Sequence, residues 1–175
     1  DMTEEEQEQN KVYMLCSDII RSYAFQRATD LYDDMPYSEA GGAFQELFYP
    51  KYDTQEEIYM NIMETLKNAA AELSEYQFQT DAQESKFSSV DILCNGDLDK
   101  WIRMANSLRL RMAMRLCHVK PDAALSTIKE LIAENRMLTE YSHDLGFEEQ
   151  DKTHAFELTF FRGLDERGYE SGAPA

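Results

Sequence analysis

The sequence predicts an all-α protein with long irregular loops, and three observations favour this fold class. Glycine and proline are scarce, with 7 and 4 among 175 residues, which argues against the many tight turns of a β-sandwich or barrel. Several segments repeat apolar residues near the helical period, and two of these segments begin with clear N-caps. The length and the 43% hydrophobic content together predict one folded domain rather than a disordered chain.

The first helix is predicted over residues 4–31. Val12, Cys16 and Ile19 recur near the helical period, and glutamates at its start suit the positive end of the helix dipole. The segment that follows, residues 32–53, mixes turn-forming residues with aromatic ones and predicts a long ordered loop. Aromatic residues in a loop pack into the neighbouring core more often than they face a ligand, so we expect that packing here.

The second helix is predicted over residues 54–75. Thr54 and Glu57 have the spacing of a capping box, in which each side chain accepts a hydrogen bond from the other residue's backbone N–H. An apolar stripe that includes Ile58, Ile62 and Leu66 then follows the helical period. Periodicity is lost after Leu73, and the polar residues up to Val90 predict a connector or insertion.

The third helix, predicted over residues 98–119, follows a turn at Asn95-Gly96 and a cap at Asp97. It is apolar nearly all round, which indicates a buried central helix containing Trp101. Its arginines are expected to pair with carboxylates, in preference to forming a cationic ligand-binding face; they are Arg103, Arg109, Arg111 and Arg115. A fourth helix is predicted over residues 122–135.

Composition and motifs exclude several classes of function. The net charge of −17 at pH 7 would repel phosphate backbones, so no nucleic-acid partner is expected. No phosphate-binding loop or nucleophile motif is present, and no catalytic residue, metal site or cofactor is expected. The weak acidic and histidine pattern near the end does not change this expectation; its members are His143, Asp144, Asp151 and His154. The three cysteines, Cys16, Cys94 and Cys117, are expected to be buried free thiols.

Three stretches resemble the SusD/RagB family of cell-surface glycan-binding lipoproteins of Bacteroidetes. They are LYDDMPYSEA at residues 31–40, YPKYDTQEEIYMNIMETLKNAAAEL at residues 49–73, and NGDLDKWIRMANSLRLRMAMRL at residues 95–116. Their order and approximate spacing also agree with the family. The family usually has glycine where this chain has Asp33.

The resemblance implies a SusD-like fold of helix pairs similar to tetratricopeptide repeats, without catalysis. It covers residues 1–139 as a partial helical core, and residues 140–175 are expected to form an irregular extended tail. Family members are longer, so the lipid anchor and the C-terminal half are expected to be absent from this chain. The implied function is to bind an oligosaccharide or related nutrient at the outer-membrane cell surface. The implied partner is a SusC-like TonB-dependent transporter, to which the nutrient is delivered.

The sequence leaves the ligand-contacting residues open. Family members hold glycans mainly by stacking sugar faces on exposed aromatic side chains, and this implies Tyr32, Tyr37, Tyr49 and Tyr52 as weak candidates. The alternative function is an intracellular helical scaffold that binds peptide segments in a groove. Helix pairs, acidity and unpaired cysteines suit that scaffold equally well, whereas the three motifs favour the surface binding protein.

Overall fold

The computed structural model describes residues 4–42, 46–139 and 145, with the backbone alone for residues 4–9. The described residues form five α-helices and no strand, with one isolated antiparallel bridge between Met35 and Asp53. The helices are α1 (Glu4–Tyr32), α2 (Gln55–Glu75), α3 (Asp81–Val90), α4 (Leu98–Leu116) and α5 (Pro121–Glu134). The all-α prediction is therefore confirmed. The predicted tail, with its histidines His143 and His154, lies outside the described residues except for Leu145.

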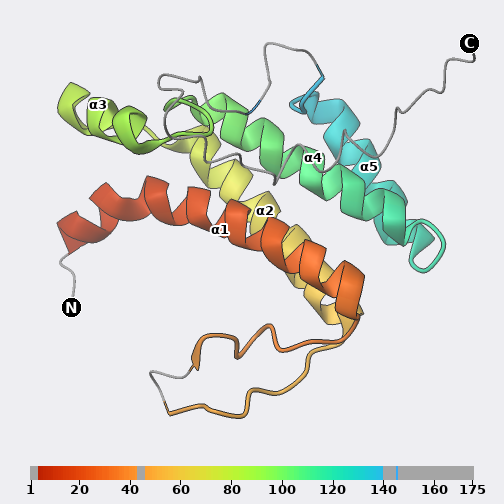
Figure 1. Ribbon diagram of the computed structural model, residues 1–175. Helices are drawn as coiled ribbons and strands as arrows, with labels where there is room; N and C mark the ends of the chain where they lie inside the picture. The colour runs from red at the N-terminus through yellow and green to blue at the C-terminus, as the bar shows by residue number, and fades with distance from the viewer. Residues whose placement is uncertain (1–3, 43–45, 140–144, 146–175) are drawn as a thin grey trace, which may run out of the picture.

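The helices form two antiparallel pairs (Figure 1). α1 and α2 run in opposite directions and are joined by the long loop, while α4 and α5 are joined by a tight turn. α2 packs against both α1 and α4, and α5 packs on α4, so α2 and α4 form the centre of the molecule. Paired antiparallel helices stacked side by side are the arrangement that the resemblance to tetratricopeptide repeats implied.

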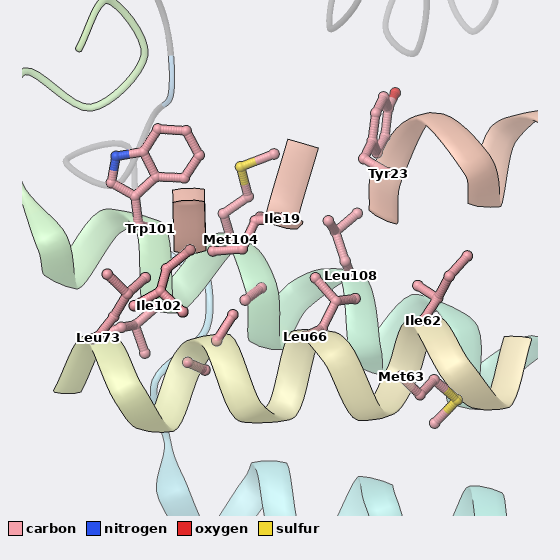
Figure 2. Packing of buried hydrophobic residues seen from close by; sticks show 14 of the residues in the cluster. Ile19, Tyr23, Ile62, Met63, Leu66, Leu73, Trp101, Ile102, Met104 and Leu108 are labelled. Carbon is pink, nitrogen blue, oxygen red and sulfur yellow. The ribbon is translucent and has the colours of Figure 1, made fainter. Parts of the chain in front are cut away.

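The core forms where the apolar faces of α1, α2 and α4 meet (Figure 2). α2 contributes the stripe predicted from its sequence, and Ile58, Ile62 and Leu66 are fully buried. α4 contributes residues from most of its circumference, which explains why its sequence is apolar nearly all round. Trp101 lies near the start of α4 and is only 4% exposed. The prediction that α4 is the central buried helix is confirmed.

The start of α4 depends on two residues with positive φ. Asn95 and Gly96 have φ values of 53° and 82°, and the Asp97 carboxylate then accepts hydrogen bonds from the N–H groups of Asp99 and Lys100. A Cβ atom at residue 96 would lie 2.0 Å from the Ser88 hydroxyl oxygen, so only glycine fits there. The predicted turn and cap are both present.

The predicted connector contains a helix that the sequence analysis missed. α3 has one buried residue, Phe87, and therefore lacks the apolar stripe by which helices are recognised. Its start nevertheless has a local signal, because the Thr80 hydroxyl accepts a hydrogen bond from Gln83 N–H at 3.2 Å. The Gln83 side chain in turn accepts one from Gln79 N–H at 2.9 Å. The T-x-x-Q spacing is a variant of the capping pattern that correctly predicted α2.

The three cysteines are free thiols, as expected. Cys16 and Cys94 are buried, whereas Cys117 is only half-buried. Burial raises the pKa of the Cys16 thiol to about 12, and burial also raises the pKa of Cys94. Because the thiolate is the reactive form, these two buried cysteines are unreactive structural residues at neutral pH.

Candidate functional site

The loop between α1 and α2 carries most of the aromatic residues that are exposed. Tyr32, Tyr49 and Tyr52 are 76%, 94% and 72% exposed, and Phe48 is exposed as well. The expectation that these loop aromatics pack into the core is wrong for all four. For the three that lie within the loop, Figure 1 shows the reason, since the loop extends away from the helices; Tyr32 is the last residue of α1. The sequence analysis did not single out Phe48, and no local pattern distinguishes it from a core residue.

Tyr37 differs from the other three candidate tyrosines because it is held against the helices. Its ring meets the Phe25 ring edge-on, with centroids 4.9 Å apart. Its hydroxyl donates a hydrogen bond to Asn61 Oδ1 at 2.7 Å. Burial raises the pKa of the Tyr37 hydroxyl. Tyr37 therefore fixes the loop to α1 and α2, and it is less exposed than the other three tyrosines.

The two arms of the loop are joined by Asp53. Its main chain exchanges two hydrogen bonds with Met35, at 3.2 and 3.0 Å. Its carboxylate accepts hydrogen bonds from the N–H groups of Ser38 and Tyr37, at 2.6 and 3.1 Å, and from the Ser38 hydroxyl at 2.9 Å. Lys51 Nζ lies 3.2 Å from the same carboxylate. The Ser38 N–H is the main cause that lowers the pKa of Asp53 to about 2.

Further contacts fix the ends of the loop to the helices. Gln55 N–H donates to the Asp34 carboxylate at 2.9 Å, and the Gln55 side chain donates to the Thr29 carbonyl at 2.7 Å. Lys51 N–H donates to the Glu39 carboxylate at 2.8 Å. Asp33 has a φ of 64°, so the turn keeps a left-handed residue where the family usually has glycine. The motifs at residues 31–40 and 49–73 are therefore architectural, because they bind each other.

The Asp53 carboxylate is expected to release the loop in acid. A carboxyl group with a lowered pKa in the folded state stabilises the fold above its unfolded pKa, and this contribution is lost as the pH falls. Because the unfolded value is about 3.9 and the folded value is about 2, the loss occurs between about pH 4 and pH 2. Amide hydrogen exchange should accelerate at Tyr37 and Ser38 in this range before it accelerates in α2.

Asp53→Asn should produce the same acceleration at neutral pH, because the neutral amide holds two N–H donors and Lys51 less strongly. Asp33→Asn is the matched control, since asparagine also tolerates a positive φ. Loop amides that exchange at the parent's rate in Asp53→Asn would contradict this role.

The arginines of α4 are mostly paired, as predicted. Arg109 lies 3.0 Å from Glu130 of α5, and Arg115 lies 2.6 Å from Asp30 of α1. Arg103 pairs with Asp99 one turn earlier on α4. The prediction is wrong for Arg111, for which no carboxylate partner is found among the described residues. Its guanidinium instead lies 6.0 Å from the centre of the Tyr23 ring, because an aromatic residue of α1 faces this side of α4.

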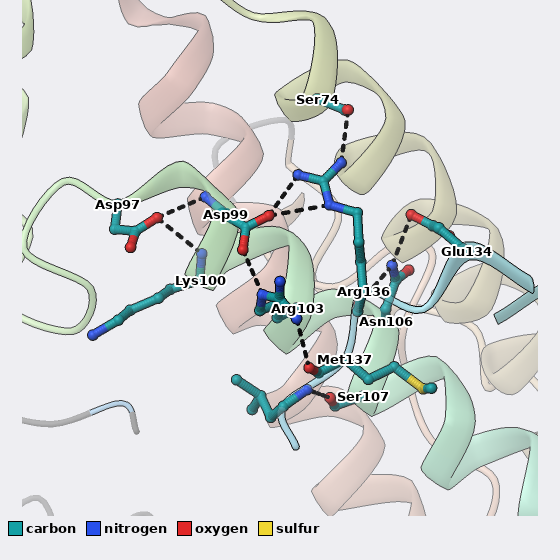
Figure 3. A network of polar contacts seen from close by, with 11 residues as sticks. Ser74, Asp97, Asp99, Lys100, Arg103, Asn106, Ser107, Glu134, Arg136 and Met137 are labelled. Carbon is teal, nitrogen blue, oxygen red and sulfur yellow. Dashed lines mark hydrogen bonds and ion pairs between the residues drawn. The ribbon is translucent and has the colours of Figure 1, made fainter. Parts of the chain in front are cut away.

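A polar network ties the segment after α5 back to α4 (Figure 3). Asn106 donates hydrogen bonds to the Glu134 carboxylate at 3.0 Å and to the Arg136 carbonyl at 3.1 Å, so it links α4 to the end of α5. Arg136 binds the Asp99 carboxylate at 2.7 Å. Ser107 accepts a hydrogen bond from Leu138 N–H at 2.9 Å. The polar residues of the third motif are thus occupied within the fold.

Other kinds of site have little support in the described residues. No group of three or more His, Cys, Asp and Glu side chains there is arranged to hold a metal ion. None of the helices between residues 4 and 139 has both the length and the apolar character needed for a bilayer crossing. The weak acidic and histidine pattern, which was not expected to bind a metal ion, lies outside the described residues. Its members are His143, Asp144, Asp151 and His154.

The geometry defines an α-helical protein built from antiparallel helix pairs, with exposed aromatic residues on a loop that is fixed at its base. The chain belongs to the SusD-like family. The model of that family, described as starch-binding associating with outer membrane, matches residues 1–162. No curated protein matches the chain.

Solved structures agree with this assignment. A SusD homologue from Bacteroides vulgatus is 29% identical with a TM-score of 0.64, covering 78% of this chain and 26% of that one. A chitin-binding SusD homologue from Flavobacterium johnsoniae is 31% identical with a TM-score of 0.62, covering 77% of this chain and 27% of that one. A SusD homologue from Bacteroides ovatus is 29% identical with a TM-score of 0.65, covering 77% and 26%. The alignments therefore span about a quarter of these relatives.

Proposed function

We propose that this chain is part of a non-catalytic protein of the outer-membrane cell surface that binds an oligosaccharide or a related nutrient. The observation that carries the proposal is the exposed aromatic loop, in which Tyr49 is 94% and Tyr52 is 72% exposed. Phe48, which directly precedes Tyr49, and Tyr32, the last residue of α1, are exposed as well. Tyr37, the remaining candidate from the sequence, serves as an anchor of this loop.

Exposed aromatic rings on a fixed loop suit sugars for a physical reason. The C–H faces of a pyranose ring are apolar, and they cover an aromatic face without loss of the hydroxyl groups' hydration. Covering about 60 Å² of ring at about 25 cal/mol per Å² gives about 1.5 kcal/mol, or about tenfold in affinity per ring. Because Asp53 fixes the base of the loop, less conformational freedom is lost on binding.

The proposed partner is a barrel transporter of the TonB-dependent, SusC-like class, which would receive the nutrient. Support comes from membership of a family described as associating with the outer membrane. The chitin-binding relative supports a glycan as the ligand class. The chain carries a net charge of −17, which disfavours polyanionic ligands such as nucleic acid.

The test measures glycan binding with the intact protein, using chitin and starch oligosaccharides in calorimetry. Tyr49→Ala should weaken binding by about tenfold, because it removes one ring face. Tyr49→Phe is the matched control and should bind like the parent, since it keeps the ring and loses only the hydroxyl. Equal affinity of Tyr49→Ala and the parent would remove Tyr49 from the site.

The partner is tested separately by isolating the intact protein from outer membranes. Recovery of a barrel transporter is the expected result. Recovery of cytosolic proteins alone would favour the peptide-binding scaffold and would contradict the proposed location.

A further inference from the structure

A pocket of about 350 Å³ lies where the end of α1, the start of α2 and the end of α4 meet. Its volume is at the lower end of the range of about 300 to 1,000 Å³ that is typical of small-molecule sites. The polar side chains that line it are Asp30, Gln55, Glu56, Tyr59 and Arg115. The pocket lies at the base of the aromatic loop, because this loop joins the end of α1 to the start of α2 (Figure 1).

The Asp30 carboxylate in this pocket is held by three side chains. It accepts hydrogen bonds from the Tyr59 hydroxyl and from the Gln26 amide. Arg115 Nη1 lies 2.6 Å from the same carboxylate. The Asp30 side chain is only 11% exposed, and both Gln26 and Tyr59 are buried. The carboxylate therefore has a fixed position before any ligand binds, which reduces the conformational freedom lost on binding.

Arg115 supplies the hydrogen-bond donors of the pocket. Its side chain is 54% exposed, although the pair with Asp30 fixes one end of the guanidinium. Among the described residues, its contacts with Asp30 and with the Tyr59 hydroxyl, at 2.6 and 3.4 Å, both use Nη1. The Nε and Nη2 groups therefore remain for a ligand, and hydrogen bonds from a charged donor are stronger than those between neutral groups.

Other lining residues supply acceptors and an apolar side. The Gln55 amide nitrogen donates to the Thr29 carbonyl at 2.7 Å, which fixes the amide and leaves its oxygen as an acceptor. The Glu56 carboxylate, a second acceptor, lies 2.5 Å from Lys120 Nζ. Val119 adds an exposed apolar surface. This combination of polar and apolar groups suits a pyranose ring, which has hydroxyl groups on its edge and C–H groups on its faces.

We infer that this pocket binds one neutral sugar unit of the oligosaccharide. The inference rests on the proposed function, to which it adds a second binding site and the class of sugar. The carboxylates of Asp30 and Glu56 are balanced by Arg115 and Lys120. An acidic sugar would add a negative charge beside two carboxylates, in a chain with a net charge of −17. The pocket therefore favours neutral glycans over acidic ones.

The test measures the affinity of the intact protein by calorimetry for chitin, starch and galacturonate oligosaccharides of equal length. Val119→Trp should weaken binding of the neutral glycan by about tenfold, because a large side chain at this exposed lining position fills the pocket and leaves its polar contacts in place. Leu125→Trp is the matched control and should bind like the parent, because Leu125 is 51% exposed on α5 and does not line the pocket. The galacturonate oligosaccharide should bind more weakly than the better neutral ligand.

A second variant tests the donors without filling the pocket. Arg115→Lys keeps the positive charge beside Asp30 but removes the Nε and Nη2 donors, so it should also weaken binding by about tenfold. Arg21→Lys is the matched control, because Arg21 is an arginine of α1 that pairs with Asp18 and does not line the pocket. Circular dichroism should show the parent's helical signal in all four variants.

The outcomes separate this inference from the proposed function. Binding that is weakened by Tyr49→Ala but keeps the parent's affinity in Val119→Trp and Arg115→Lys would overturn the pocket and retain the loop. Tighter binding of galacturonate than of either neutral oligosaccharide would overturn the class of sugar. A parent protein that binds none of these glycans would contradict the proposed function, and the inference would fall with it.

Discussion

Replacing Trp101 with alanine is expected to lower the free energy of unfolding by about 3 to 5 kcal/mol, the usual cost of truncating a large buried aromatic residue. Trp101 is 4% exposed and packs in the cluster where α1, α2 and α4 meet. The change also removes the indole N–H that donates to Asp91 at 2.8 Å. The loss therefore affects both the core and the turn that starts α4. Urea denaturation of the full chain, followed by circular dichroism, measures it.

Two further variants separate these contributions. Trp101→Phe keeps an aromatic ring in the core but removes the donor to Asp91, so it should cost less than Trp101→Ala. Met114→Ala lies on the same helix at an exposed position, and its effect should stay within about 0.5 kcal/mol. A Trp101→Ala protein as stable as the parent, or a parent whose native fluorescence is already red-shifted, would show that the side chain is exposed.

The sequence predicted those parts of the fold that depend on local signals. The caps at Thr54 and Asp97 depend on residues within one helix turn, and the apolar stripe of α2 depends on residues along one helix face. The structure has all three where they were expected. α3 lacks an apolar stripe because one residue, Phe87, attaches it to the core. α4 ends at Leu116, earlier than predicted. The N–H groups of Val119 and Lys120 both donate hydrogen bonds to the Leu116 carbonyl, and the turn they form leads into Pro121.

The candidate site was predicted only in part, because its geometry depends on contacts between distant residues. The sequence pointed to the loop that exposes Tyr49 and Tyr52, but it could not distinguish them from Tyr37, which Phe25 and Asn61 anchor. Asp53 and Asp91 act as hubs for backbone N–H groups that the chain brings to them on folding. Nothing in the spacing of carboxylates marks these two among the 34 acidic residues of the chain.

The same dependence on distant contacts decides which arginines of α4 are structural. Arg109 is buried and Glu130 is its partner, and Glu130 also accepts a hydrogen bond from Lys67 of α2 at 3.1 Å. This one carboxylate therefore connects α2, α4 and α5. Arg111, two residues along, has no comparable partner among the described residues and faces the Tyr23 ring.

Arg109→Ala is accordingly expected to destabilise the full chain by about 1 to 3 kcal/mol, the cost of leaving a buried polar group unsatisfied, since Glu130 is 40% exposed and its ion pair is screened by solvent. The change removes a buried stem from the core and leaves Glu130 without its main partner. It also removes the donor that lies 3.3 Å from the Oδ1 atom of the fully buried Asn106, and this unsatisfied buried acceptor is the main source of the expected loss.

Arg111→Ala is the matched control on the same helix, and it should cost no more than about 1 kcal/mol because it removes a cation–π contact alone. Urea denaturation of both variants gives the difference, and calorimetry with the intact protein shows whether either arginine contacts the ligand. If these arginines are structural, glycan affinity stays at the parent's value in every variant that remains folded. An Arg109→Ala protein that unfolds like the parent but loses its ligand would instead place a cationic binding face on α4.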